Sequence, residues 1–189
     1  RGAEELRACL EHTHVPEDMS PRTYRLDPYG APGERYAAAR ALAAGGPAAA
    51  DRAIAELKAA GLRGRGGAGF PTGLKWTFLP QNHPGPIYFC LNADESEPGT
   101  FNNRILMEDD PHQVIEGLIL SCYATNARAA YFYMRCEYPL AWNRILRAVD
   151  EAYAAGYLGK NILGSQYSLD IFLHRGAGAY ICGEESALI

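Results

Sequence analysis

A glycine-rich segment that is also basic and aromatic is the part of this sequence best suited to chemistry. Residues 61–76 read GLRGRGGAGFPTGLKW and include six glycines. Because glycine lacks a Cβ and tolerates positive φ, such a backbone can approach a ligand closely. Its free amides can bind phosphate oxygens, and Arg63, Arg65 and Lys75 add positive charge. Phe70 and Trp76 can lie against a flat ring, so the segment suits a ligand that is both anionic and aromatic.

The spacing of these glycines resembles a dinucleotide fingerprint, but the surrounding sequence does not. Residues 64–69 match G-x-G-x-x-G, a pattern that requires a strand before it and a helix after it. Here residues 51–60 predict a helix that ends at Gly61, whereas Pro71 and Gly73 predict a loop after the glycines. An ordinary Rossmann assignment therefore fails for this loop. The alternative is a flexible surface loop or linker, which has little use for aromatic side chains beside arginines.

An acidic cluster, residues 92–99 (NADESEPG), forms a second candidate site. Its carboxylates, Asp94, Glu95 and Glu97, would repel a phosphate, so we expect them to face sugar hydroxyls or an amide. Two alternatives are a solvated acidic turn and a site for a divalent cation, because oxygen-rich loops also bind hard cations.

Residues 174–185 (HRGAGAYICGEE) form a third candidate site. A predicted strand, a glycine turn and a predicted helix follow one another here, in the order that a phosphate site at a helix N-terminus requires. Glu184 and Glu185 also suit the start of a helix without any further function. A structural role for His174 is the alternative to an acid–base role.

The chain thus contains two glycine-rich segments and two acidic clusters, whereas one nucleotide needs about one of each. We interpret the pair as binding a flavin and a pyridine nucleotide in one cavity. Hydride transfer between such cofactors requires little acid–base chemistry from the protein, which instead orients the rings.

Alternating strands and helices must position these segments. Asp110, followed by Pro111 and Gln113, predicts a helix start. Strand–helix alternation predicts an α/β fold with a parallel sheet and right-handed crossovers, Rossmann-like in type, preceded by a helical and glycine-loop region. The predicted helices are residues 34–44, 50–60, 111–126 and 139–155 and a last one from Tyr180, and the predicted strands are residues 87–91, 129–134 and 169–173.

Ligands of parallel sheets bind beyond the carboxyl ends of the strands. The site is therefore expected in residues 92–100, 135–137 and 174–185, completed by the glycine loop. Residues 1–60 are expected to form an extended arm and helices, and residues 61–189 the binding domain.

Composition excludes several classes of protein. A net charge of −4 gives no basic face for nucleic acid, and no apolar run is long enough to span a membrane. Of the five cysteines, no two have CxxC spacing, so no metal site is predicted and reduced thiols are expected. Cys90 and Cys122 are predicted to be core residues. The sequence indicates a cytoplasmic fragment of a longer protein, because its last helix has no stop signal.

Taken together, residues 61–76, 92–99, 110–117 and 174–185 resemble the flavin-carrying, NADH-oxidising subunit of bacterial respiratory complex I. The same family includes diaphorase subunits of NAD-linked hydrogenases and formate dehydrogenases. The similarity extends from about Tyr24 to the last residue. Two departures are Cys136, where the family usually has glycine, and Asn103, where an acidic residue is common.

The resemblance implies FMN and NADH as cofactors. It places Phe70 and Phe78 at the adenine end of NADH, and the two expected catalytic residues, Glu97 and Glu185, near its nicotinamide half. Arg65, Gly69 and Ser96 belong to the same cofactor-binding segments. The other residues implied for NADH are Gly67, Ala68 and Lys75, and those implied for FMN are Gly64, Gly66, Lys75, Asn92, Asp94, Glu95, Tyr180, Gly183 and Glu184.

The resemblance also implies a reaction and an assembly. In the whole protein, NADH would give a hydride to FMN, and electrons would pass through iron–sulfur centres toward quinone. The partners would be other peripheral-arm subunits, especially a small iron–sulfur subunit, which would hold the protein at the cytoplasmic face of the membrane. A [4Fe-4S] cluster is expected only in a region beyond this sequence. The alternatives are a diaphorase module and a non-catalytic nucleotide-binding assembly module.

Overall fold

The computed structural model describes residues 34–46, 48–80 and 83–189, and the expected arm of residues 1–32 lies outside these ranges. Three parallel strands form its sheet, in the order β1 (Tyr88–Ala93), β2 (Ala129–Met134) and β3 (Asp170–Arg175). The predicted parallel α/β sheet is thus confirmed, with β2 at its predicted bounds and the other two strands displaced by one or two residues. The carboxyl-end residues Ala93, Met134 and Arg175 lie in register, so the segments after all three strands leave the same edge.

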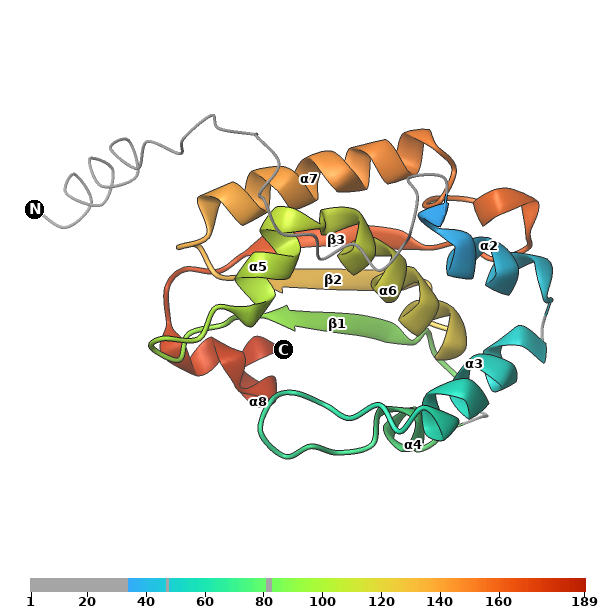
Figure 1. Cartoon of the computed structure of the whole chain (residues 1–189), viewed down its shortest axis with the longest axis horizontal. Coiled ribbons are helices and arrows are strands. Elements are labelled where there is room, and N and C mark those ends of the chain that lie inside the picture. Colours follow the sequence, from blue (N-terminus) through green and yellow to red (C-terminus); the bar gives the residue numbers. More distant parts are fainter. Residues whose placement is uncertain (1–33, 47, 81–82) are drawn as a thin grey trace, which may run out of the picture.

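The helices between the strands pack on one face of the sheet (Figure 1). Helices α5 (Asn102–Asp109) and α6 (Pro111–Ala124) connect β1 to β2, and α7 (Pro139–Ala154) connects β2 to β3. Because consecutive strands are neighbours, right-handed crossovers place both connections on the same side. The core lies in this layer, where β2 contributes its fully buried residues. They pack with apolar residues of α6 and α7; among the core side chains are Phe132, Met134, Ile115, Leu118 and Ile145.

Helix α6 begins as the sequence predicts, whereas α5 was not predicted. The Asp110 side chain accepts a hydrogen bond from the Gln113 amide at 3.2 Å, with Pro111 in the first turn. Helix α5 has only eight residues and lacks a capping side chain of its own. Its first amides instead bind the Glu95 carboxylate, a contact between separate segments that no local pattern reveals.

The opposite face of the sheet is aromatic and exposed. Tyr131 and Phe172 stack there with ring centroids 5.3 Å apart, and Tyr88 is also exposed. Cys90 lies in the same row, so the prediction of a core position for Cys90, and of a fully buried first strand, is wrong. Cys122 on α6 is buried as expected. The reason is that an apolar run cannot reveal which face of its strand a helix covers.

Helices α2 (Ala37–Ala44), α3 (Ala48–Ala59) and α4 (Thr72–Trp76) precede β1. Buried Glu116 holds the start of α2, because its carboxylate accepts from the amides of Tyr36 and Ala39. Helix α3 ends at Gly61 as predicted, in a left-handed conformation with φ of 64°.

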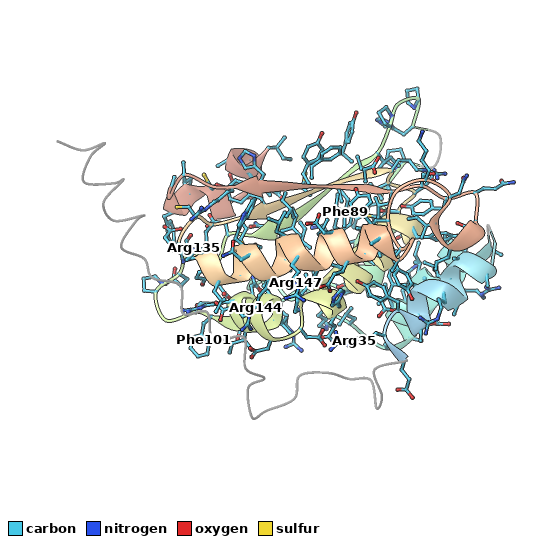
Figure 2. All side chains as sticks on the ribbon, turned by 90° about the horizontal axis from the view of Figure 1, so that it is seen from above. Arg35, Phe89, Phe101, Arg135, Arg144 and Arg147 are labelled. Carbon is cyan, nitrogen blue, oxygen red and sulfur yellow. The ribbon has the colours of Figure 1, made fainter. Side chains whose placement is uncertain are left out.

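The short helix α4 replaces the loop expected around Pro71 and Gly73. Gly73 is buried where α4 meets α3, because a Cβ at this position would lie 3.0 Å from the Lys58 amide nitrogen and 3.1 Å from the Ile54 carbonyl oxygen. The residue therefore serves close helix packing rather than a turn. Figure 2 shows α7 lying across the sheet from above, on the side away from these helices.

Candidate functional site

The glycine loop is a closed excursion of the chain between α3 and α4. Arg63 and Pro71 form an antiparallel bridge, and the Gly64 amide donates to the Phe70 carbonyl at 2.9 Å. The Arg63 guanidinium donates to the Gly69 carbonyl at 3.0 Å, so this cation braces the loop itself. Gly67 and Gly69 have φ of 109° and 61°, conformations that glycine adopts without strain.

Between these closing bonds the loop presents free donors. Within the described part of the chain, the amides of residues 65–70 donate no hydrogen bond to the backbone. A Cβ added at Gly66, Gly67 or Gly69 would meet no atom within 4 Å, so the loop borders open space. Consecutive unpaired amides of this kind can bind an anion.

Phe70 and Phe78 form an aromatic pair beside the loop. Their ring centroids lie 5.9 Å apart with the planes at 57°, and both side chains are exposed. The structure therefore brings together the two residues expected at the adenine end of a dinucleotide.

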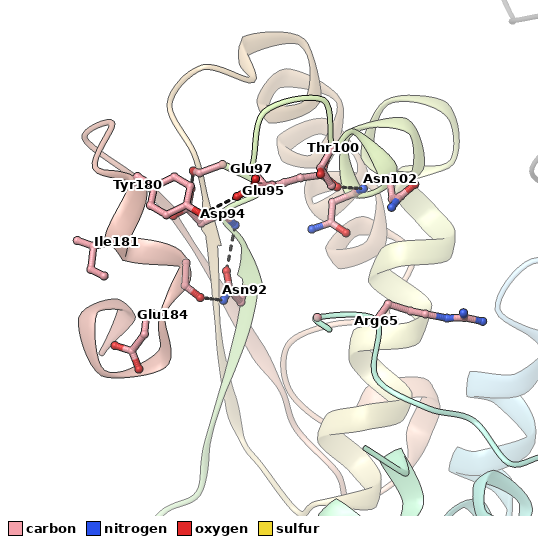
Figure 3. Close-up of a pocket in the computed structure, with 14 residues that line it drawn as sticks. Arg65, Asn92, Asp94, Glu95, Glu97, Thr100, Asn102, Tyr180, Ile181 and Glu184 are labelled. Carbon is pink, nitrogen blue, oxygen red and sulfur yellow. Dashed lines mark hydrogen bonds between the residues drawn. The ribbon is translucent and has the colours of Figure 1, made fainter. Parts of the chain in front are cut away.

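The segments after β1 and β3 meet at the carboxyl edge of the sheet, as predicted (Figure 3). The Asn92 side chain donates to the Gly183 carbonyl at 2.8 Å, and the Tyr180 hydroxyl donates to the Glu97 carboxylate at 2.6 Å. Gly183 is required at this junction, because a Cβ there would lie 3.2 Å from the Asp94 carbonyl oxygen.

Asp94 contains an unsatisfied acceptor in this region. Its Oδ1 atom accepts from the Ser96 hydroxyl at 2.6 Å, whereas its buried Oδ2 atom has no hydrogen-bond partner in the structure. A buried polar atom without a partner is costly, and a ligand hydroxyl would satisfy it.

Two adjoining cavities, of about 750 and 890 Å³, contain most of the predicted site residues. Gly66, Asn92, Gly183 and Glu184 line both cavities. The first is also lined by Arg65, Asp94, Glu95, Ser96, Glu97 and Tyr180, and the second by Gly64, Ala68, Gly69, Phe70, Lys75 and Glu185. Both volumes are in the range of small-molecule sites.

Three predicted residues lie apart from this arrangement. Gly67 and Phe78 line neither cavity, although Phe78 packs on Phe70. Figure 3 shows the Arg65 side chain extending away from the other labelled residues, so only its base borders the first cavity. Asn102 and Asn103 line the first cavity but were missed as lining residues, because the sequence did not predict α5.

The helix expected from Tyr180 is shorter than predicted. Residues Tyr180–Gly183 form one 3-10 turn, and α8 covers only Glu185–Leu188. The Glu184 carboxylate caps α8 by accepting from the amides of Ser186 and Ala187, and the backbone hydrogen bond with Ser186 lowers the pKa of this carboxyl. The predicted anion site at a regular helix N-terminus is therefore wrong in this form, because Glu184 occupies those amides.

The segment after β2 does not reach the cavities, contrary to expectation. Residues 135–137 line neither of them. Instead the Arg135 guanidinium donates to the Glu95 carbonyl, behind the cavity wall. Strand register alone placed this segment at the correct edge but could not place it relative to the acidic segment in front of it.

Two searches of the described residues had negative results. These residues contain no group of three or more His, Cys, Asp or Glu side chains able to hold a metal ion. Among them, no helix combines the length and apolar character needed to cross a bilayer.

Comparison with known proteins points to one family. Residues 57–189 match the family described as Complex1_51K, the Nuo51 FMN-binding domain. The chain is 53% identical to a subunit of the NADH-quinone oxidoreductase of Aquifex aeolicus, over 89% of this chain and 38% of that protein. It is 55% identical to the NADH-quinone oxidoreductase subunit of the same name in Rhodobacter capsulatus, over 74% of this chain and 32% of that protein. The chain thus spans well under half the length of these relatives.

A solved structure shares the fold. An NAD+-reducing [NiFe]-hydrogenase in its H2-reduced state superposes with a TM-score of 0.67 and 33% identity, over 98% of this chain and 33% of the hydrogenase chain.

Proposed function

Because this chain belongs to the family of Nuo51 FMN-binding domains, we propose that its two adjoining cavities hold FMN and NADH and that the whole protein oxidises NADH. The observation that carries the proposal is the junction of the cavities. There the glycine loop, the end of β1 and the turn after β3 each contribute to both walls, through Gly66, Asn92, Gly183 and Glu184.

The residues at this junction fit FMN. Free amides of residues 65–70 and the Lys75 ammonium suit its phosphate, and the unsatisfied Asp94 Oδ2 atom suits a ribityl hydroxyl. Gly183 allows the backbone to pass close to Asp94 and leaves room beside it. We assign FMN binding to Gly64, Gly66, Lys75, Asn92, Asp94, Glu95, Tyr180, Gly183 and Glu184.

The same cavities have room for a second nucleotide. Phe70 and Phe78 supply an aromatic surface for an adenine ring, near the glycine loop. Glu97 and Glu185 border the two cavities and are assigned to the nicotinamide half, where their carboxylates can accept hydrogen bonds from ribose or amide groups.

When bound, FMN supplies the acceptor for the hydride of NADH and the capacity to release electrons one at a time. The side chains of this protein then bind and orient the two rings and exclude water, and Tyr180 and Glu97 hold one wall of the first cavity closed through their hydrogen bond. No general acid or base on the protein is needed for this reaction.

We propose a respiratory assembly for the whole protein, in which a small iron–sulfur subunit and other peripheral-arm subunits bind it at the membrane surface and carry electrons toward quinone. A [4Fe-4S] cluster would belong to a part of the protein beyond these residues. The division into an N-terminal region of residues 1–60 and a binding domain of residues 61–189 is part of the same proposal.

A diaphorase role is the second candidate, because the solved structure with this fold is an NAD+-reducing hydrogenase. Its identity to this chain is 33%, whereas the respiratory subunits reach 53 to 55%, so the respiratory role is preferred. Genes for membrane subunits beside the coding gene would support the respiratory role, and hydrogenase genes would reverse the order.

The test measures binding and turnover separately on the native protein with its partner subunits. We expect the protein stripped of flavin to quench FMN fluorescence on titration, and the reloaded protein to reduce ferricyanide with NADH. Binding of FMN without ferricyanide reduction would favour a non-catalytic assembly module. Absence of FMN binding would reject the proposal.

A further inference from the structure

The connection between β2 and α7 holds the acidic segment from behind. The Arg135 guanidinium donates to the Glu95 carbonyl, and the Tyr138 hydroxyl lies 3.3 Å from the same oxygen. Neither Arg135 nor Tyr138 lines a cavity, so these contacts are not part of the binding surface itself.

The Glu95 carboxylate is held as firmly as its carbonyl. Its two oxygens accept from the amides of Asn103 and Arg104 at 2.9 and 3.1 Å, and the second oxygen also lies 3.2 Å from the Tyr138 hydroxyl. Glu95 is buried, with 6% of its surface exposed. It therefore links the end of β1 to the start of α5, and Tyr138 contacts both of its polar ends.

Arg135 and Tyr138 also hold each other. The guanidinium lies 5.0 Å from the centre of the Tyr138 ring, and its Nε atom donates to Glu137 at 3.2 Å. A planar guanidinium can serve a ring face, a carboxylate and a carbonyl together, which a lysine ammonium cannot do.

Glu95 stands between the residues that face the first cavity. Asp94 precedes it, with its unsatisfied oxygen, and Ser96 and Glu97 follow it. The backbone bonds at Glu95 therefore set the direction in which the side chains on both sides leave the chain.

We propose that Arg135 and Tyr138 are positioning residues that fix Glu95, and through it the placement of Asp94 and Glu97 against the ligand. The inference rests on the proposed function for the identity of the ligand, FMN. It adds two side chains that touch no ligand, on the one strand end that does not border the cavities.

The experiment compares Tyr138→Phe with Tyr153→Phe in the native protein with its partner subunits. Both changes remove one tyrosine hydroxyl. That of Tyr153 binds Asp170 at 3.1 Å and accepts from the Ile171 amide at 3.0 Å, at the opposite end of the sheet. Arg135→Lys is the conservative variant at the other position. The readouts are the FMN dissociation constant by fluorescence titration, the melting temperature, and hydrogen–deuterium exchange of the Asn103 and Arg104 amides.

We expect Tyr138→Phe to weaken FMN binding roughly three- to tenfold, as for a lost hydrogen bond to a charged group. Exchange at the two amides should become faster, whereas Tyr153→Phe should leave both readouts unchanged. Arg135→Lys should weaken binding by a smaller factor, because it keeps the charge but not the planar geometry.

Two results would overturn the inference. One is wild-type FMN affinity and amide exchange in Tyr138→Phe. The other is an equal loss of affinity in both tyrosine variants that follows their melting temperatures. If the unaltered protein fails to bind FMN, the proposed function fails instead, and the amide exchange alone then decides whether Tyr138 holds Glu95.

Discussion

Glu97 and Tyr180 connect the two acidic and glycine-rich segments of the candidate site at the level of single atoms. The Tyr180 hydroxyl donates to Glu97 at 2.6 Å, and this hydrogen bond raises the pKa of Tyr180. The tyrosine therefore stays a donor throughout the physiological pH range. The Glu97 carboxylate keeps further lone pairs for a ligand, since an ionised carboxylate accepts about four hydrogen bonds.

The variant Glu97→Gln tests this residue in the complete protein. We expect the Michaelis constant for NADH to rise roughly tenfold, because an amide accepts a weaker hydrogen bond than a carboxylate. Flavin content should be unchanged. The measurements are steady-state NADH–ferricyanide kinetics and the flavin absorbance per protein.

Glu56→Gln on the exposed side of α3 is the matched control and should leave both quantities unchanged. Loss of flavin from Glu97→Gln, with unchanged NADH kinetics in the molecules that retain it, would reject the placement of Glu97 near NADH.

At the scale of elements, the position of the glycine loop depends on how α4 packs against α3. Gly73 makes this packing possible, because a Cβ there would come within 3.1 Å of the α3 backbone. The loop is attached directly to α4, so a displacement of α4 also displaces Lys75 and the loop amides. Gly117 provides a contrast, since it lies exposed within α6 and a Cβ there would meet nothing within 4 Å.

Alanine at these two glycines should therefore have opposite effects on the free energy of unfolding. We expect Gly73→Ala to destabilise the protein by roughly 1–3 kcal/mol through overpacking. We expect Gly117→Ala to stabilise it by about 0.5–1 kcal/mol, because alanine loses less backbone entropy in a helix. Chemical denaturation measures both.

FMN titration of the same variants separates packing from binding. Gly73→Ala should also weaken FMN binding, whereas Gly117→Ala should not. A stable Gly73→Ala protein with unchanged affinity would show that the loop does not depend on close packing of α4.

At the scale of the whole molecule, one helical layer and one sheet face enclose a core that contains ionisable groups. Burial raises the pKa of Tyr167, mainly by desolvation, and raises that of Cys122 to about 12. Burial likewise raises the pKa of Tyr36, with the charge of Glu116 adding to the effect. All three groups are neutral in the folded protein at pH values where an unfolded chain would ionise them.

The sign of the resulting pH dependence follows from linkage. Groups with a raised folded pKa contribute stability that is fully present below their ordinary values of 9.0 for Cys122 and 10.0 for Tyr167, and this stability is lost as the pH rises toward the folded values. We expect the melting temperature to fall steadily above about pH 9. Calorimetry from pH 7 to 11 measures it.

Tyr167→Phe should make this alkaline decline shallower, even though the variant loses a hydrogen bond to the Ala127 carbonyl and is less stable at pH 7. An unchanged slope in Tyr167→Phe would indicate that this tyrosine does not contribute to the alkaline transition.

The sequence alone determined the elements that follow from local rules. Periodicity and the cap at Asp110 predicted α6, and apolar runs predicted all three strands within two residues. Alternation of strands and helices determined that the sheet is parallel, and therefore that residues 92–100 and 174–185 meet at one edge. Spacing and residue type identified the glycine loop and the acidic segment, because glycine and carboxylate chemistry is a local property.

Only the tertiary structure decided the features that depend on contacts between distant segments. Helix α5 forms on amides held by Glu95, Gly73 is a packing residue between two helices, and Cys90 is exposed because helices cover the other face of its strand. Local sequence carries no record of which neighbour lies opposite a residue. The hydrogen bonds of Arg135 and Tyr138 to Glu95 span 40 and 43 residues and exist only after the chain has folded.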